Sequence, residues 1–470
     1  MTHIHFIGIG GSGLSAMARL LLERGEVVSG SDRQWSDAAQ DVRAAGAQVF
    51  IGHQAENLGN ADLVVRSSAI PDENVEVQAA LATGIPVYKR ADFLNQIMQG
   101  HRVIAIAGTH GKTTTTAMIA WMLAALNIDP SYLIGSVSAN LKTNAHAGAS
   151  DLFVIEADEY DRMFHGLNPW LAVVTNIEYD HPDCFPTHED FWQAFYEFMN
   201  RMVRDGILLA CSDDPGSMRL LKQANADGRA ALSYGLRRMA DNSGPDYCAQ
   251  NLSHNHHGGV SFEVYFGQWL EGWSAPIAEL ELQVPGSHNV SNALVALAVA
   301  DLIGLSVSQA AQALSAYQGV ERRFQVRGEA NGILVIDDYA HHPTEIKATL
   351  AAARGQFPNR RIWSVWQPHT YSRTRTLFDQ FVNAFKDADR VVVTEVYAAR
   401  EPLPEDGFSA RQMVDVMSNP DALYVPDLGH ATDLLMDSLQ PGDVLLVLSA
   451  GDATQISSDV LLQMKARISE

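Results

Sequence analysis

The stretch from residue 103 to residue 116 constrains the fold more than any other part of the chain. It reads Val-Ile-Ala-Ile-Ala-Gly-Thr-His-Gly-Lys-Thr-Thr-Thr-Thr. The apolar residues 103–107 predict a buried strand, and the glycines after them predict a turn that leads into a helix from about Thr113. Such a turn binds phosphate, because its exposed amides and the positive end of the helix both attract anions. Lys112 would then reach the outer phosphates, and the Thr113 hydroxyl would hold Mg²⁺.

This loop departs from the common phosphate-binding pattern, which would place a glycine at Ile106. It has the variant Gly108-Thr-His-Gly-Lys-Thr113 instead. The alternative interpretation is a glycine turn that only caps an ordinary helix. The preceding strand, the following helix and the additional Gly108 favour phosphate binding. The predicted nucleotide-binding residues of the loop are Gly108, Thr109, His110, Gly111, Lys112, Thr113 and Thr114.

A second glycine-rich turn, Gly8-x-Gly10-x-x-Gly13, follows an apolar strand near the N-terminus. Asp32 ends the next predicted strand, about 20 residues beyond the glycines, and this spacing is typical of dinucleotide-binding turns. The alternative is a tight packing turn between a strand and a helix, since the glycine triplet alone is a weak signal. The expected elements of this small doubly wound domain are a helix at 14–23 and strands at 26–30, 48–51, 63–66 and 86–88.

Polar side chains follow two apolar strands beyond the loop. The strand at 152–155 runs into Glu156-Ala-Asp-Glu-Tyr-Asp161, and the strand at 171–174 runs into Thr175-Asn-Ile-Glu-Tyr-Asp-His181. In a parallel sheet, both polar segments lie at the same edge as the phosphate-binding loop. Glu156 and His181 would therefore sit beside the nucleotide's metal ion, as ligands or as partners of ligands. The alternative for each segment is a solvated acidic turn.

Two further polar features occur before residue 320. Asn289 and Asn292 lie near the start of a strongly helical run, 290–303, and share one face of it. Asparagine is unfavourable inside a helix, so the pair suggests a polar ligand such as adenine or phosphate, with N-capping as the alternative. The sequence His254-Asn-His-His-Gly-Gly259 is interpreted as a polar hairpin loop rather than a metal site.

From residue 321 onward, β–α alternation resumes, and each strand again ends in polar residues. Histidine and arginine are frequent there, which suits an anionic substrate facing the phosphate-binding loop across a cleft. The predicted fold is α/β with three domains: a Rossmann-like domain at 1–100, a central ATPase-like domain with a mostly parallel sheet at 101–320, and a second Rossmann-like domain at 321–470.

Composition excludes several classes of partner. The net charge of −22 argues against nucleic acid, which needs clustered lysine and arginine. Cys184, Cys211 and Cys248 form no CxxC pair, which fits a reducing cytoplasm. The N-terminus lacks the features of a signal peptide, and no apolar run reaches the roughly 18 residues that span a bilayer. We expect a cytoplasmic protein that is a monomer or a weak homodimer.

Several motifs, in order along the whole chain, resemble those of the Mur ligase family. They are Gly108-Thr-His-Gly-Lys-Thr-Thr, Glu156-Ala-Asp-Glu, Thr175-Asn-Ile-x-x-Asp-His181, His288-Asn-x-x-Asn292, Arg322-Arg-Phe324 and Asp337-Asp-Tyr-Ala-His-His-Pro-Thr-Glu345. The resemblance implies an ATP- and Mg²⁺-dependent enzyme that adds amino acids to the UDP-muramyl precursor of peptidoglycan. Gly8-Ile-Gly-Gly-Ser-Gly13, Gln367-Pro-His-Thr-Tyr-Ser-Arg-Thr374 and Tyr397-Ala-Ala-Arg-Glu401 most resemble the branch that joins L-alanine to UDP-N-acetylmuramate. The branch that attaches a tripeptide during cell-wall recycling is the alternative.

The resemblance also implies roles for individual residues. The implied catalytic residues are Lys112, Glu156, His181, Arg323 and Asp338, with Thr113, Glu156 and His181 as metal ligands. Asn289, Asn292 and Arg323 would contact ATP. The UDP group would bind at Gly10, Gly11, Ser12, Gly13, Asp32, Ser67, Ser68 and Arg90, and the amino acid at Tyr339, His341, Arg373 and Arg375.

Two departures from the family pattern affect these roles. Some members have arginine where this chain has Thr370, which shifts the expected binding of substrate charge to Arg373 or Arg375. Other branches use a carbamylated lysine after the His181 motif, whereas residues 184–201 contain no lysine. That role is either absent here or taken by an acid such as Glu197.

Three rival classes remain open from the sequence. An NAD-dependent dehydrogenase would explain the N-terminal glycine turn but leaves Lys112 and the acids after the central strands without a role. A non-catalytic nucleotide switch would not explain the histidines and arginines of the third domain. A folate-type polyglutamate ligase should lack the N-terminal domain.

Overall fold

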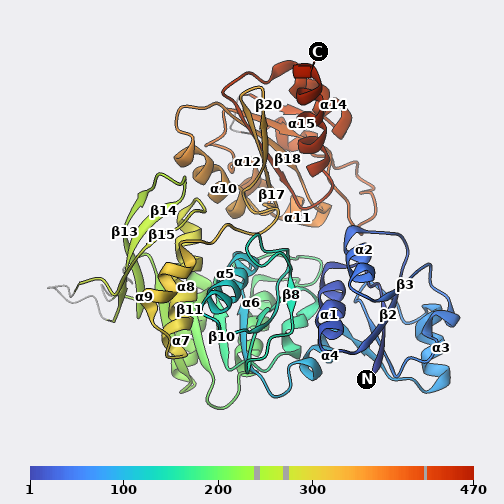
Figure 1. The fold of residues 1–470 in the computed structure, drawn as a ribbon. Helices are drawn as coiled ribbons and strands as arrows, with labels where there is room; N and C mark the ends of the chain where they lie inside the picture. The colour runs from blue at the N-terminus through green and yellow to red at the C-terminus, as the bar shows by residue number, and fades with distance from the viewer. Residues whose placement is uncertain (238–243, 268–274, 418–420, 470) are drawn as a thin grey trace.

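The computed structural model describes residues 1–237, 244–267, 275–417 and 421–469. Figure 1 shows a blue N-terminal unit, a central unit coloured from cyan to yellow, and an orange to red unit that lies above the central one. Among the described residues, these units contain sheets of five, ten and six strands, most of them parallel. This arrangement confirms the predicted three-domain α/β fold.

The first sheet is entirely parallel and has the order β3-β2-β1-β4-β5. Strand order reverses between β1 and β4, so the glycine turn after β1 lies where open α/β sheets bind ligands. Its strands are β1 (His3–Ile7), β2 (Val27–Asp32), β3 (Gln48–Ile51), β4 (Leu63–Arg66) and β5 (Val87–Lys89). Its helices are α1 (Ser12–Glu23), α2 (Asp37–Ala44), the 3₁₀ helix η1 (Ala55–Leu58), α3 (Val75–Thr83) and α4 (Arg90–Ile97).

The second sheet has the order β15-β14-β13-β12-β11-β10-β6-β9-β7-β8. The loop-bearing strand β6 lies between β9 and β10 and runs parallel to both, so the two polar segments flank the phosphate-binding loop as predicted. Its strands are β6 (Arg102–Ala107), β7 (Ser131–Leu133), β8 (Ala145–His146), β9 (Leu152–Glu156), β10 (Leu171–Val174), β11 (Ile207–Cys211), β12 (Ala230–Gly235), β13 (Tyr247–His254), β14 (Val260–Phe266) and β15 (Ala278–Glu281). Its helices are α5 (Lys112–Ala125), the 3₁₀ helix η2 (Tyr160–Gly166), α6 (His188–Asn200), α7 (Pro215–Ala226), α8 (Ser287–Leu302) and α9 (Val307–Leu314).

The third sheet has the order β16-β17-β21-β18-β19-β20, and β16 pairs antiparallel to β17. Its strands are β16 (Gln325–Ala330), β17 (Ile333–Asp338), β18 (Ile362–Gln367), β19 (Arg390–Val393), β20 (Ala422–Tyr424) and β21 (Val444–Ser449). Its helices are α10 (Pro343–Gln356), α11 (Tyr371–Thr376), α12 (Phe378–Val382), α13 (Arg411–Val414), α14 (Leu428–Ser438) and α15 (Thr454–Ser469).

The elements on both sides of the phosphate-binding loop, β6 and α5, are buried and hold the loop in place. Residues 103–107 of β6 are buried, and α5 buries its residues 113–120. Helix α8 is apolar on nearly all sides because it packs between α5, α9 and the sheet. Two asparagines of α8 are buried as well, which places polar groups beside the loop rather than in solvent.

The hairpin predicted around His254 is formed by β13 and β14, with the turn between them. Glu281 of β15 places a carboxylate oxygen within 4.8 Å of ring nitrogens of His256 and His257. This acid comes from a neighbouring strand, so sequence spacing did not reveal it. All three side chains are exposed.

The three cysteines are free thiols, and Cys211 and Cys248 are buried. Among the described residues, every helix falls short of the length and apolar character that a bilayer crossing requires.

Candidate active site

The phosphate-binding loop joins β6 to α5 through two glycines in the left-handed region, Gly108 (φ +137°) and Gly111 (φ +84°). A Cβ atom at Gly108 would lie 2.0 Å from Thr175 Oγ1, and one at Gly111 would lie 2.8 Å from Asn292 Oδ1. Both positions therefore require glycine, for space as well as for backbone conformation. Lys112 Nζ donates to the Gly108 carbonyl at 2.6 Å, so the lysine is folded back over its own loop.

Carboxylates at the end of β9 and in the segment after it face Lys112 and Thr113. The Thr113 hydroxyl donates to Glu156 Oε1 at 3.0 Å, and Lys112 Nζ lies 2.8 Å from Glu159 Oε2. Burial raises the pKa of Glu156, and Lys112 opposes this rise. A threonine hydroxyl and a carboxylate side by side form a donor set that suits Mg²⁺. Thr113 and Glu156 therefore fit the predicted metal site.

His181 lies on the other side of these carboxylates, where the segment after β10 ends. Its Nε2 is 3.5 Å from Glu159 Oε1, and its backbone adopts the left-handed conformation with φ +55°. The neighbouring Asp180 accepts two hydrogen bonds from Arg373 of the third domain, at 2.6 and 3.1 Å. Both partners of this ion pair are buried, and Arg373 holds the pKa of Asp180 well below its usual value against the effect of burial. The pair fixes the third domain against the loop that carries His181.

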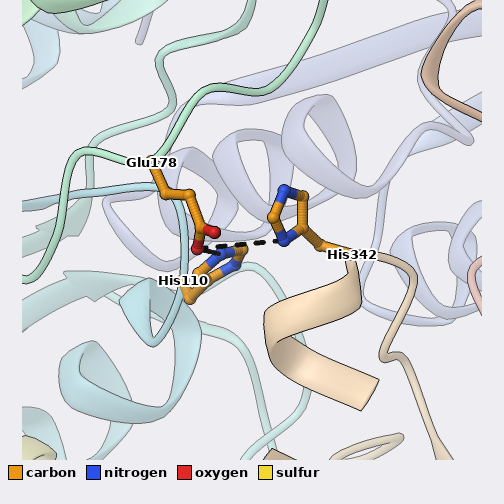
Figure 2. A group of neighbouring side chains, drawn as sticks. All are labelled: His110, Glu178 and His342. Carbon is orange, nitrogen blue, oxygen red and sulfur yellow. Dashed lines mark hydrogen bonds and ion pairs between the residues drawn. The ribbon is translucent and has the colours of Figure 1, made fainter. Parts of the chain in front are cut away.

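A second contact between the central and third domains involves His110 (Figure 2). His110 Nε2 lies 3.0 Å from Glu178 Oε2, and its Nδ1 lies 3.2 Å from Glu345 Oε1. Burial lowers the pKa of His110, but the two carboxylates outweigh this effect and raise it to about 9. Figure 2 shows His342 facing the same carboxylate, with Nδ1 3.9 Å from Glu178. His110, Glu178 and His342 have the spacing of metal ligands, but both His110 nitrogens are engaged by carboxylates, which fits an imidazolium bridge.

Asp338, at the end of β17, organises the turn that carries Arg323. Its two carboxylate oxygens each accept a backbone hydrogen bond at 2.7 Å, one from Phe324 and one from Ala340. Burial raises the pKa of Asp338 to about 6, although Arg323 and these hydrogen bonds oppose the rise. The Arg323 guanidinium lies 5.1 Å from the centre of the Tyr339 ring. Asp338 thus positions the arginine, while Arg323 itself faces the cavities.

The predicted asparagines of α8 share one face, as expected. Asn292 Nδ2 donates to Asn289 Oδ1 at 3.2 Å, and Asn289 Nδ2 donates to the Pro285 carbonyl at 2.7 Å. The N-cap of α8 is Gly286, which makes no side-chain capping bond. The capping alternative is therefore wrong for both asparagines.

The glycine turn of the first domain is held by Asp32, the acid at the end of β2. Asp32 Oδ2 accepts a hydrogen bond from the Gly10 backbone at 2.8 Å. A Cβ atom at Gly13 would lie 2.3 Å from Arg90 Cζ, so the arginine packs directly against the start of α1. Burial lowers the pKa of Arg90, and Asp158 and Glu156 across the domain boundary oppose this effect. Arg90 therefore links the first domain to the carboxylates of the second.

Two adjoining cavities contain most of the predicted residues. The first, of about 580 Å³, is lined by residues of all three domains, among them Ser12, Gly13, Arg90, Thr109, Lys112, Thr113, Glu156, Glu159, His181, Arg323, Tyr339, His341, Glu345, His369 and Arg373. The second, of about 830 Å³, includes His110, Gly111, Thr113, Thr114, Asn289, Asn292, Arg323 and Asp338. Thr113 and Arg323 line both, so the two spaces meet at the phosphate-binding loop.

Some predicted residues line neither of these two cavities: Gly10, Gly11, Asp32, Ser67, Ser68, Gly108 and Arg375. Arg375 forms an exposed ion pair with Asp406, and its proposed contact with the amino acid stays a prediction. Glu197 pairs with Arg162 at 3.0 Å and lies outside both cavities. Glu159, which was not among the predicted site residues, is the acid that faces both Lys112 and His181.

Other residues at the site were also missed, namely Glu178, Asp180, Glu345 and His369. Each lies inside a polar segment that follows a buried strand. That position was the available signal, because such segments gather at one edge of a parallel sheet.

The fold and the site define a class: a three-domain α/β protein whose phosphate-binding loop opens into a cleft of carboxylate, histidine and arginine side chains. Three family models match successive parts of the chain: "Mur ligase family, catalytic domain" at residues 3–102, "Mur ligase middle domain" at 106–300, and "Mur ligase, glutamate ligase domain" at 322–451. The chain belongs to the Mur ligase family.

Similar proteins cover the whole chain. A UDP-N-acetylmuramate–L-alanine ligase of Roseiflexus castenholzii is 41% identical over 98% of this chain and 97% of its own length. The crystal structure of the UDP-N-acetylmuramate-alanine ligase MurC of Thermotoga maritima matches with a TM-score of 0.81 and 28% identity, over 99% of this chain and 100% of that one. A murein peptide ligase of Psychrobacter arcticus matches with a TM-score of 0.68, also at 28% identity, over 99% of both chains.

Proposed function

We propose that this chain joins L-alanine to UDP-N-acetylmuramate with ATP, giving ADP and phosphate, in the synthesis of peptidoglycan precursors. The cavity lined by Lys112, His341 and Arg373 carries the proposal, because the loop expected to bind phosphate and the residues expected to bind the amino acid line the same space. The full-length similarity to ligases of this specificity supports the choice of substrates. The higher TM-score with the alanine ligase than with the murein peptide ligase points in the same direction.

The reaction requires activation of a carboxylate, which is a poor electrophile. Transfer of the ATP γ-phosphoryl group to the lactyl carboxylate of the UDP substrate gives an acyl phosphate. The amino group of alanine then attacks the carbonyl carbon, and phosphate leaves from the tetrahedral adduct. Negative charge accumulates at both steps, so the site must supply fixed positive charge.

The positive charge comes from both central and third domains. Lys112 lies next to the loop amides that would receive the phosphates, and Arg323 faces the same space from the third domain. Thr113 and Glu156 would hold one Mg²⁺ and His181 a second, and Mg²⁺ supplies charge neutralisation at the transferring phosphoryl group. Asn289 and Asn292, in the adjoining cavity, would contact the nucleotide.

In this proposal, each of the three domains binds a different substrate. Residues 1–100 bind the UDP group through Gly10, Gly11, Ser12 and Gly13 at the start of α1, with Arg90 beside them, and residues 101–320 bind ATP. Residues 321–470 provide Tyr339, His341 and Arg373 around the alanine. The boundaries at 100 and 320, the cytoplasmic location and the monomeric or weakly dimeric state remain predictions.

The test is release of ADP and phosphate with Mg·ATP and UDP-N-acetylmuramate, comparing L-alanine with the L-Ala-D-Glu-diaminopimelate tripeptide. We expect turnover with alanine. Turnover with the tripeptide alone would assign the chain to cell-wall recycling instead. No turnover with either, together with NAD binding, would favour the dehydrogenase interpretation.

A further inference from the structure

His341 has the surroundings of a proton acceptor. It follows β17 and precedes α10, and its Nδ1 lies 2.9 Å from the Tyr339 carbonyl oxygen and 3.2 Å from Glu345 Oε2. Both neighbours of Nδ1 are hydrogen-bond acceptors, so Nδ1 must carry the proton. In the neutral ring, Nε2 therefore carries a lone pair. His341 lines the three-domain cavity, and among the described residues Nε2 has no hydrogen-bond partner.

His369 faces His341 with the opposite tautomer. The two ring centroids are 6.0 Å apart. Arg373 Nη1 lies 3.1 Å from His369 Nδ1, and arginine can only donate, so Nδ1 accepts and Nε2 carries the proton. The two neutral rings thus offer one acceptor and one donor to the same cavity. An amino acid presents the matching pair, an amino group that donates and a carboxylate that accepts.

We propose that His341 Nε2 takes the proton that the attacking amino group loses during amide formation. This step rests on the proposed function. The C–N bond forms as the amine attacks the acyl phosphate, and the C–O bond to phosphate breaks. The nitrogen proton passes to His341 Nε2 and then to the departing phosphate or to solvent, so protons and electrons balance. Glu345, behind Nδ1–H, stabilises the imidazolium that forms.

The other histidines of the site are less suited to this task. His110 has carboxylates at both ring nitrogens and a raised pKa, so it is already protonated at neutral pH. His342 Nδ1 accepts the backbone N–H of Thr344 at the start of α10, and its Nε2 is buried without a partner. His181 is a predicted metal ligand. His341 alone of these four combines a fixed proton on Nδ1 with a lone pair that opens on the cavity.

The protonation state of His341 agrees with this role. Burial lowers its pKa to about 3, so the ring is neutral near pH 7. The charged and titratable groups that face it are Glu345 of α10, Arg373 of α11, Asp180 after β10, His369 after β18 and Tyr339 after β17. Glu345 and Asp180 favour the imidazolium, and Arg373 opposes it. The proton donor is the alanine nitrogen in the tetrahedral adduct, which becomes positively charged on attack. Its proton is far more acidic than that of the ammonium group of free alanine.

Two variants separate proton transfer from structure. His341→Gln keeps an acceptor near the position of Nε2, and His341→Asn keeps a donor near Nδ1 for the Tyr339 carbonyl; neither side chain can take a proton. Hydroxylamine traps an acyl phosphate as a hydroxamate and is largely unprotonated near pH 7. The assay therefore compares hydroxamate formation without alanine to ligation of alanine, both with Mg·ATP and UDP-N-acetylmuramate. His430→Gln, an exposed histidine on α14, is the matched control.

Both His341 variants should form hydroxamate within about twofold of the wild type, and their kcat for alanine should fall by about 100-fold or more. Their remaining ligation should rise with pH, because hydroxide then replaces the missing base. Wild-type ligation rates in either variant, or equal losses of ligation and hydroxamate formation, would overturn the proposal. A wild-type enzyme that forms no hydroxamate and does not ligate alanine would overturn the proposed function itself, whereas ligation without hydroxamate would overturn only the proton-transfer proposal.

Discussion

Glu76, near the start of α3, gives the stability of the first domain a specific pH dependence. Its side chain is 0% exposed, and its carboxylate accepts hydrogen bonds from the Ser31 hydroxyl and from Asn57 Nδ2 at 2.6 Å. Ring nitrogens of His5 and His53 lie 3.5 Å away. Burial alone would raise the pKa of Glu76, but the nearby His5 ring and the hydrogen bonds from Ser31 and Asn57 outweigh it and lower the pKa from 4.5 to about 2.

The direction of the effect follows from proton linkage. Because the carboxyl of Glu76 is more acidic in the folded state, the unfolded chain binds more protons between pH 4.5 and about 2. The stabilisation is therefore complete above pH 4.5 and is lost as the pH falls toward 2. At about 1.4 kcal/mol per pH unit, the lowered pKa corresponds to about 3 kcal/mol of unfolding free energy.

Glu76→Gln imitates the protonated acid, so it should destabilise the first domain by about 3 kcal/mol at pH 7. The assay is urea unfolding followed by the fluorescence of Trp35, the only tryptophan in residues 1–100, isolated by subtracting matched Trp35→Phe variants. The difference from wild type should shrink below pH 4.5. Glu73→Gln, at an exposed neighbouring acid, should stay within about 0.5 kcal/mol. A Glu76→Gln penalty that did not change between pH 7 and pH 3 would refute the reasoning.

The remaining predictions concern the cleft. Lys112→Ala should lower kcat by about 100-fold or more, because a fixed positive charge beside the transferring phosphoryl group is lost, while calorimetry shows unchanged binding of UDP-N-acetylmuramate. Arg373→Ala leaves Asp180 buried without its partner and should cost about 3–5 kcal/mol in urea unfolding, and adding Asp180→Asn should recover part of this loss. Chelation with EDTA should stop ADP release, and added Mg²⁺ should restore it; turnover that persists in EDTA would exclude the metal sites at Thr113 and His181.

Local patterns in the sequence were sufficient to predict many of the strands and the edge that carries the site. The strands at 48–51, 63–66 and 171–174 have the predicted bounds, because each is a short apolar run between turn residues. The polar segments after β9 and β10 flank the phosphate-binding loop because parallel strands end at the same edge. The parallel direction of β6 and β9 was therefore enough to predict that Glu156 lies near Thr113.

Contacts between domains could not be predicted in this way. Arg373 and Asp180 are 193 residues apart, and His110 and Glu345 are 235 residues apart. Such pairs depend on how whole domains pack, and hydrophobic periodicity carries no information about that packing. Glu159 is a different case, because it lies in the same domain as Lys112 and His181. The sequence suggested Glu197 as the additional acid because the search covered only the residues after His181, whereas Glu159 precedes His181 in the chain and lies between Lys112 and His181.

Glu159 also bears on how the cleft accepts its substrates. In this structure its carboxylate is 2.8 Å from Lys112 Nζ, so the lysine already has an anionic partner where a phosphate would bind. An ATP phosphate that engages Lys112 competes with Glu159 for the lysine, and an unpaired buried carboxylate is costly. A divalent cation near His181 would offset that cost, since Glu159 lies 3.5 Å from the His181 ring. We therefore expect ATP and metal binding to be mutually dependent, because the metal ion would replace Lys112 as the partner of Glu159 once ATP has engaged the lysine.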